Sequence, residues 1–300
     1  MALILRQISY GGWPNCLLLT NETIELIVTL DVGPRIIRCG FHDEDNLFKE
    51  YREQLGTTGG DDWRIYGGHR LWHAPEIKPR TYSPDNAAVP HQWDGLTLTL
   101  VQDTEPLTHI GKHLTIKMSA DRNEIAVTHE LINNGPWAIT TAPWCLTVLA
   151  PGGRAVLPQE RFIPFPDALL PARPLVLWHY TDMADSRFTF STNFIELRQD
   201  SNAQNPQKLG IRNSCGWGLY EKNGTVFLKR AALIPDAIYP DFNSNWELYT
   251  NHEMLELETL GPLTHLEPGS KVTHEEIWSL HKTQSNLESS KLIKVLGLSC

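Results

Sequence analysis

Apolar and polar positions alternate with a period of two along most of the chain, which is the pattern of half-buried β-strands. Ile24, Leu26 and Val28 share one face of such a segment, and Gly33-Pro34 then bends the chain. The alternation recurs in the segments 96–101, 187–198, 252–262 and 271–281. The sequence therefore predicts a chain built mainly of strands.

Two turns are placed to join neighbouring strands into hairpins. The turn at residues 121–123 separates two alternating segments, and Asn223-Gly224 separates two more. Asn-Gly favours the tight turn whose twist matches that of paired antiparallel strands. We therefore expect antiparallel pairing.

Helical spacing is confined to the C-terminal end, where a Ser285-x-x-Glu288 capping-box pattern predicts one short helix. The proline-rich stretch 157–178 predicts a long surface excursion between strands. No repeat or low-complexity block divides the chain. The prediction is an all-β, antiparallel sandwich in one domain over residues 1–282, followed by residues 283–300 as a tail or short helix.

Composition and charge exclude several classes of protein. A net charge of −9 argues against a nucleic-acid-binding surface, and no apolar run approaches the roughly 20 residues that span a bilayer. The apolar run at the N-terminus is too short for a signal peptide. The five cysteines are odd in number and show no C-x-x-C spacing, so neither a zinc site nor a disulfide framework is expected. The cytoplasm is the expected location.

The segment "YGGHRLWHAPE", residues 66–76, gathers the groups that suit a ligand. His69 and His73 are four residues apart, but metal ligation is disfavoured because glycine and proline leave room for little helix. As a loop or strand end, the segment offers imidazoles as acid or base and Arg70 as a donor to hydroxyls or an anion. Trp72 adds a flat face for a sugar ring. A purely structural loop with satisfied histidines is the alternative.

Two later segments add candidate groups. Glu256 and Glu258 share one face of a predicted strand, opposite its leucines, and would face either solvent or a groove. Tyr239 and Asp241 belong to a loop rich in donors, acceptors and rings, and Lys208 lies in a segment that flanks a strand. The chain has no G-x-S-x-G, P-loop or G-x-G-x-x-G motif, which leaves nucleophile-elbow hydrolases, NTPases and dinucleotide enzymes without support.

Several of these segments resemble the galactose-mutarotase-like, or aldose 1-epimerase-like, superfamily. "DVGPRIIRCGF" is similar to the family's opening strand and matches it at Arg35, and residues 66–76 fall where the family carries a sugar-contacting segment. Residues 249–280 resemble its C-terminal signature of a glutamate-bearing strand, a loop to L-x-P-G and a last strand. The resemblance implies a β-supersandwich of the galactose mutarotase type with a concave carbohydrate site and no cofactor.

In that family a glutamate takes the proton of the anomeric hydroxyl while a histidine protonates the ring oxygen. By resemblance, Leu257-Glu258-Thr259 makes Glu258 the base, with Glu256 as second choice. The remaining candidate substrate contacts are Arg70, Trp72, Glu76, Arg35, Lys208, Tyr239 and Asp241.

The family's acid histidine has no counterpart here, because the nearest segment carries Pro143-Trp144. The acid would then come from His69, His73 or His129. Two functions follow: a sugar mutarotase or epimerase, or a non-catalytic carbohydrate-binding or sensing protein on the same scaffold. Arg70 leaves open an anionic sugar, such as a sugar phosphate or uronic acid, since its planar fork matches those groups. The sequence predicts neither the sugar nor the oligomeric state.

Overall fold

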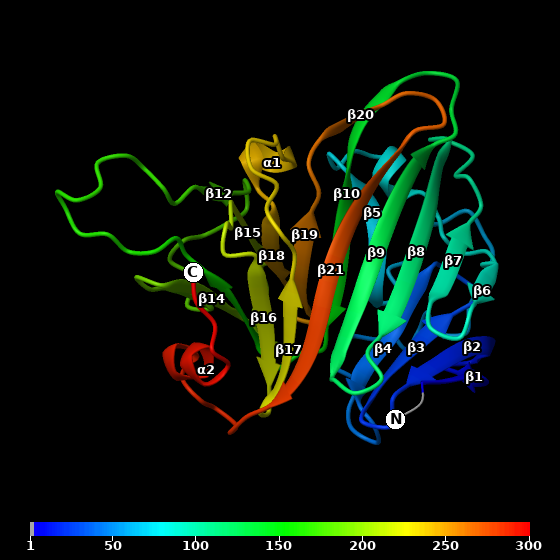
Figure 1. Ribbon diagram of the computed structural model, residues 1–300, viewed down its shortest axis with the longest axis horizontal. Coiled ribbons are helices and arrows are strands. Elements are labelled where there is room, and N and C mark those ends of the chain that lie inside the picture. Colours follow the sequence, from blue (N-terminus) through cyan, green and yellow to red (C-terminus); the bar gives the residue numbers. More distant parts are fainter. Residues whose placement is uncertain (1–2) are drawn as a thin grey trace.

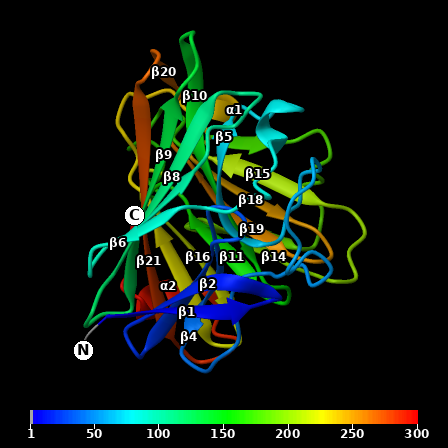
Figure 2. The ribbon, with the colours of Figure 1, turned by 90° about the vertical axis from the view of Figure 1, so that its right-hand side faces the viewer.

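A computed structural model describes residues 3–300 as two large antiparallel sheets that face each other (Figures 1 and 2). The first sheet contains, in spatial order, β1 (Ile4–Tyr10), β2 (Trp13–Thr20), β3 (Ile24–Thr29), β4 (Arg35–Phe41), β5 (Gly68–Ala74), β10 (Ile139–Leu149), β19 (Leu255–Leu260), β18 (Trp246–Thr250), β15 (Gln207–Ile211) and β12 (Leu175–Leu177), with β20 (Thr264–Leu266) paired to β10.

The second sheet contains, in spatial order, β13 (Phe188–Phe190), β14 (Phe194–Arg198), β11 (Arg154–Pro158), β16 (Trp217–Lys222), β17 (Thr225–Arg230), β21 (Lys271–Lys282), β9 (Glu124–Asn133), β8 (Ile110–Met118), β7 (Leu98–Gln102) and β6 (His91–Trp93). Helix is restricted to η1 (Arg80–Tyr82), α1 (Pro240–Asn243) and α2 (Ser289–Val295). The described residues contain no helix that is both long and apolar enough to cross a membrane.

The main hydrophobic core lies between the two sheets. Leu255 and Leu257 of β19 are fully buried there, together with Trp278 of β21 and Phe227 of β17. Because side chains alternate along a strand, the neighbours of these leucines on β19 must point away from the core. This alternation creates the outer face on which the candidate site lies.

Both predicted hairpins are present. β8 and β9 pair with Met118 opposite Ile125, and β16 and β17 pair with Lys222 opposite Thr225. The turn residues Asn223 and Gly224 both have positive φ angles, 52° and 81°, as the tight hairpin turn requires. The proline-rich stretch also emerges as expected, as a projection without regular structure between β11 and β12 (Figure 1).

The C-terminal segment packs on the outer face of the second sheet. Leu292 of α2 is fully buried against a cluster that includes Trp217 and Leu228. The helix begins at Ser289 and Glu288 makes no side-chain cap, so the helix prediction is confirmed but the predicted capping box is absent.

A disulfide joins Cys215 to Cys300 at the end of this segment. This disulfide is contrary to the expectation from the odd number and spacing of the cysteines. The two cysteines are 85 residues apart, and only the packing of the C-terminal segment brings them together.

Candidate functional site

Alternation places charged and aromatic side chains together on the outer face of the first sheet. β5, β10, β19, β18 and β15 are consecutive neighbours, and the following residues lie in register across them. The outward-facing set is Arg70 and Trp72 of β5, Trp144 of β10, Glu256 and Glu258 of β19, Glu247 and Tyr249 of β18, and Lys208 of β15. We call this set the outer-face cluster.

Glu258 is at the centre of the cluster and is fully buried. The indole Nε1 of Trp144 donates a hydrogen bond of 2.7 Å to its Oε2, and the Lys208 ammonium lies 3.1 Å from the same oxygen. The same ammonium lies 2.8 Å from Oε2 of Glu247, so one lysine serves two buried carboxylates. The indole and the ammonium together hold Glu258 in place as a hydrogen-bonded carboxylate.

Lys208 carries its charge in a nearly closed environment. Its ammonium lies over the rings of Trp144 and Trp178, at 4.8 and 4.7 Å from their centroids. Burial opposes the charged form, but Glu247 and Glu258 outweigh it and hold the pKa of Lys208 well above its usual value. The lysine is therefore a fixed cation and a poor proton donor.

Glu256 differs from Glu258 although both lie on one face of β19. Burial raises the pKa of Glu256 to about 7; Glu258 adds to the rise, and Arg70 opposes it. The Arg70 guanidinium lies 3.3 Å from Glu256 and 4.6 Å from the centre of the Trp72 ring. The Nε and Nη1 donors of Arg70 are buried and have no partner among residues 3–300. Glu256 can therefore gain and lose a proton near neutral pH.

A cavity of about 300 Å³ opens above this cluster and meets it at Trp144. It is lined by Pro75, Glu76, Ile77, Lys78, Tyr82, Trp144, Trp178 and Asp241. Asp241, Phe242 and Asn243 all have positive φ angles of 48–72°, an unusual conformation that places the Asp241 side chain at the cavity while Phe242 is 90% exposed. The cavity thus combines two indoles, a phenol and two carboxyl groups.

The structure does not bring the predicted histidines to this cavity. His69 and His73 alternate with Arg70 and Trp72 along β5, so they point to the opposite face and are fully buried between the sheets. His73 Nε2 lies 3.3 Å from Glu105, and burial lowers its pKa. The sheet itself separates both histidines from Glu258, contrary to expectation.

His69 belongs to a hydrogen-bonded network between the sheets. Its Nδ1 contacts the hydroxyl of Thr147 at 2.8 Å and its Nε2 contacts Nε2 of His129 at 2.7 Å. Burial lowers the pKa of both histidines, which favours their neutral forms. His129, the third candidate acid, therefore faces the core as well.

The same network contains ligand atoms that are close enough to hold a metal ion, since His69, His129 and Glu276 converge. The ammonium of Lys229 lies 2.9 Å from Glu276 and is fully buried. This built-in cation already neutralises the carboxylate, and a divalent ion would have to lie beside it. The cluster is therefore best described as a satisfied polar network.

Two further predicted contacts have structural roles. Arg35 is fully buried; its Nη1 donates to the carbonyl oxygens of Ile65 and Gly67, and its Nη2 to Asp85 at 2.6 Å. The Tyr239 hydroxyl accepts a hydrogen bond from the Ile234 backbone at 2.8 Å. Neither lines the cavity.

Four residues at the site were not predicted from the sequence: Glu247, Trp178, Tyr82 and Trp63, whose ring lies 5.4 Å from that of Trp72 and tilted to it. Alternation in "NWELY" could have identified Glu247, because Trp246 and Leu248 are the apolar positions on either side of it. The other three come from segments without a period.

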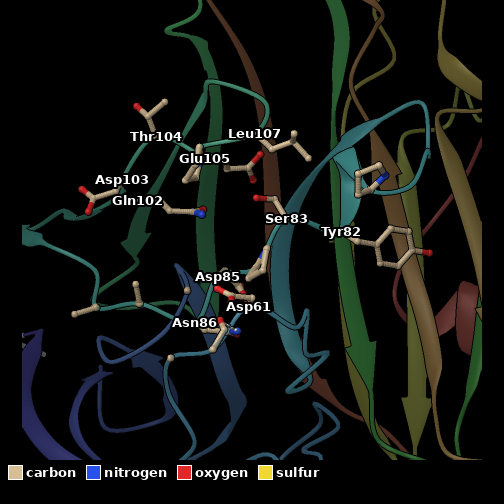
Figure 3. A pocket seen from close by; sticks show the side chains of 18 residues that line it. Asp61, Tyr82, Ser83, Asp85, Asn86, Gln102, Asp103, Thr104, Glu105 and Leu107 are labelled. Atoms are coloured by element: carbon tan, nitrogen blue, oxygen red, sulfur yellow. Dashed lines mark hydrogen bonds between the residues drawn. The ribbon is translucent and has the colours of Figure 1, made fainter.

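A larger cavity, of about 600 Å³, lies between the segments 82–88 and 102–107 (Figure 3). Its lining includes Asp61, Asp85, Asp103 and Glu105 and contains no lysine, arginine or histidine side chain. Asp85 and Glu105 are already paired with Arg35 and Lys112. No indole lines this cavity, so the cavity above the outer-face cluster has the richer chemistry.

Comparison with known proteins locates the fold. No family model matches the sequence, and no curated protein matches it. Solved structures do match: a galactose mutarotase-like protein from Lactobacillus casei ATCC 334 has a TM-score of 0.57 at 10% identity, over 89% of this chain and 100% of that one. The chain has the galactose-mutarotase-like fold.

Two other solved structures are also similar to this chain. A galactose mutarotase related enzyme from Lactobacillus acidophilus gives a TM-score of 0.52 at 10% identity, over 91% of this chain and 100% of that chain. A TPR-domain containing protein from Parabacteroides distasonis ATCC 8503 gives 0.58 at 13% identity over 91% of this chain, which spans 48% of that protein. The predicted β-supersandwich of the galactose-mutarotase-like type is confirmed; at these identities the likeness is one of fold.

Proposed function

We propose that the cavity above the outer-face cluster binds a free sugar, and that Glu258 and Glu256 move protons at its anomeric centre. The observation that carries the proposal is the pair of carboxyl groups on one face of β19 in unlike environments. Two residues along a strand place their Cα atoms roughly 6.6 Å apart. Two carboxyl groups with different partners on one strand face can take the roles of base and acid.

In this mechanism the Glu258 carboxylate accepts the proton of the anomeric hydroxyl. The bond between the anomeric carbon and the ring oxygen breaks, and the ring oxygen takes the proton of Glu256. The aldehyde rotates, and the reverse transfers close the ring in the other anomer and restore both carboxyl groups. The pKa of about 7 suits Glu256 to this exchange. Glu256 would take the role of the acid histidine, which has no counterpart in this chain.

The rest of the cluster supports binding. Trp144 and Trp178 offer ring faces to a sugar, and the two unpartnered donors of Arg70 suit hydroxyl oxygens. Trp144 stands in the segment where the resemblance would place the acid histidine, and here its indole holds the candidate base.

Exchange NMR or polarimetry of anomers across a panel of free aldoses tests the proposal. We expect anomer exchange above the buffer rate for at least one sugar, and a loss of about 100-fold or more in Glu258→Gln. Glu275→Gln, an exposed position on β21, is the matched control and should keep the wild-type rate. An unchanged rate in Glu258→Gln would remove the assignment.

A second function, sugar binding without catalysis, is favoured by one observation: Glu258 is fully buried and already engaged by Lys208 and Trp144. A binding protein would show sugars raising the melting temperature while anomers exchange only at the buffer rate. Measurement of both quantities on one sample separates the two functions.

A further inference from the structure

The site is short of positive charge. Five carboxyl groups line the cavity or lie directly beneath it: Glu76, Asp241, Glu247, Glu256 and Glu258. Three cationic side chains face them: Arg70, Lys208 and Lys78. With every group ionised, five negative and three positive charges leave a net charge of −2.

The two buried cations are already committed to buried carboxylates. Arg70 pairs with Glu256, and Lys208 pairs with Glu247 and Glu258. Glu247 is fully buried, and its Oε1 has no hydrogen-bond partner in the described part of the chain. Burial raises the pKa of Asp241, as it raises that of Glu247. These carboxyl groups would be stabilised as anions by one more cation.

Asp241 and Glu76 are the two carboxyl groups at the cavity itself. Neither forms a salt bridge with a lysine or arginine of residues 3–300, and Glu76 accepts only the hydroxyl of Tyr82. Trp144 and Trp178 line the same cavity, and indole faces attract cations through their ring quadrupoles. The way Lys208 stacks on both indoles shows that these faces accept an ammonium group.

We propose, building on the sugar-binding function above, that the preferred ligand is an amino sugar whose ammonium group lies between Asp241 and Glu76 while its ring rests against the indoles. An anionic sugar would instead bring its charge next to unpaired carboxylates. The phosphate or uronate alternative that Arg70 raised in the sequence is therefore disfavoured, because Glu256 already balances the charge of Arg70.

Calorimetric titration of the full chain tests this inference with D-glucosamine, D-galactosamine, their neutral parent sugars and glucose 6-phosphate. At about pH 6.5 the amine is charged, being below the usual pKa of an α-amino group. We expect at least one amino sugar to bind about 10-fold or more tightly than its neutral parent, and the phosphate to bind most weakly.

The variant Asp241→Asn should reduce the preference for the amine over its neutral parent to about 3-fold or less. Asparagine tolerates the left-handed backbone found here, so the loop should keep its shape. Asp121→Asn, on the exposed β8–β9 turn, is the control and should keep the full preference.

The possible failures are distinguishable. If a neutral parent or the phosphate binds as tightly as the amino sugars, or if Asp241→Asn keeps the preference, this inference is wrong while the sugar site stands. If no sugar of any class binds, the proposed function fails together with it.

Discussion

Glu256 and Glu258 are the same residue type on the same strand face, and their partners make them different. Glu258 is held by an ammonium and an indole N–H, whereas Glu256 has a guanidinium at 3.3 Å and a pKa of about 7. That they share a face could be predicted from alternation alone. Their partners could not, because Lys208 and Arg70 reach them through pairings 50 and 186 residues away in sequence.

The raised pKa of Glu256 has a consequence for stability. The folded state keeps this proton up to about pH 7, whereas an ordinary glutamate loses it near 4.5. Raising the pH through this window therefore favours the unfolded state. Relative to Glu256→Gln, the wild type should lose up to about 3 kcal/mol of unfolding free energy between about pH 4.5 and 7. Denaturant titrations across that range measure the difference.

In the same titrations Glu275→Gln, an exposed position, should track the wild type at every pH. A constant offset between wild type and Glu256→Gln over the whole range would show that Glu256 titrates normally, and the acid assigned to it would lose its basis.

Lys208 is the cation that two buried carboxylates share, so its removal should be costly. Lys208→Met would leave the carboxylates of Glu247 and Glu258 buried without a cation. The expected cost is about 3–5 kcal/mol in the free energy of unfolding. Adding Glu247→Gln should recover part of it, since one buried charge is removed. Lys291→Met, on the exposed side of α2, serves as control. A cost under about 1 kcal/mol in the single variant would contradict the network.

Strand β5 decides which groups of "YGGHRLWHAPE" belong to the outer-face cluster. The strand runs from Gly68 to Ala74 and is buried along its whole length. A strand buried on both faces gives no polar–apolar alternation to assign its sides. The sequence therefore predicted the histidines and Arg70 in one hollow. In the structure they lie on opposite faces of the first sheet.

Glycine is required at Gly67 and Gly68 because a larger side chain there would clash with neighbouring backbone. Gly67 has a φ of +102°, and a Cβ there would lie 1.9 Å from the carbonyl oxygen of Lys49. Gly67→Ala should therefore cost at least about 2 kcal/mol and disturb the start of β5. Gly152→Ala, with a φ of +90° but no atom within 4 Å, should cost only about 1 kcal/mol. Thermal unfolding of both variants compares them, and equal costs would show that the close approach is unimportant.

Over the whole molecule, the antiparallel pairing of the strands could be predicted from local features of the sequence. Hairpins at 121–123 and at Asn223-Gly224 join strands close in sequence, so turn chemistry and alternation were enough to predict antiparallel pairing. The strand order β5-β10-β19-β18-β15 could not be predicted from the sequence, because each pairing except β18–β19 joins segments that are distant along the chain. That order assembles the outer-face cluster, and alternation within a single strand does not specify it.

The Cys215–Cys300 disulfide should stabilise the fold by tying the C-terminal segment to the second sheet. If Cys215 and Cys300 are joined in the purified protein, Cys300→Ser should lower the free energy of unfolding by about 2–4 kcal/mol, because the bond closes a loop of 85 residues. Cys39→Ser, at a free buried thiol, would be the comparison. Mass spectrometry without reductant checks the bond itself. Its absence would favour the reducing cytoplasm that the cysteine count first indicated.

The hollow over β5, β10, β19, β18 and β15 is the proposed ligand-binding site, and one NMR experiment tests this directly. The indole N–H signals of the protein are followed by ¹⁵N NMR during titration with the sugar that calorimetry finds tightest. We predict that the signals of Trp144 and Trp178 shift with the binding curve, while those of Trp217 and Trp246 stay fixed. Shifts confined to backbone signals of residues 83–86 and 102–107, with the indole signals of Trp144 and Trp178 unchanged, would place the ligand in the larger cavity. That result would contradict binding above the outer-face cluster.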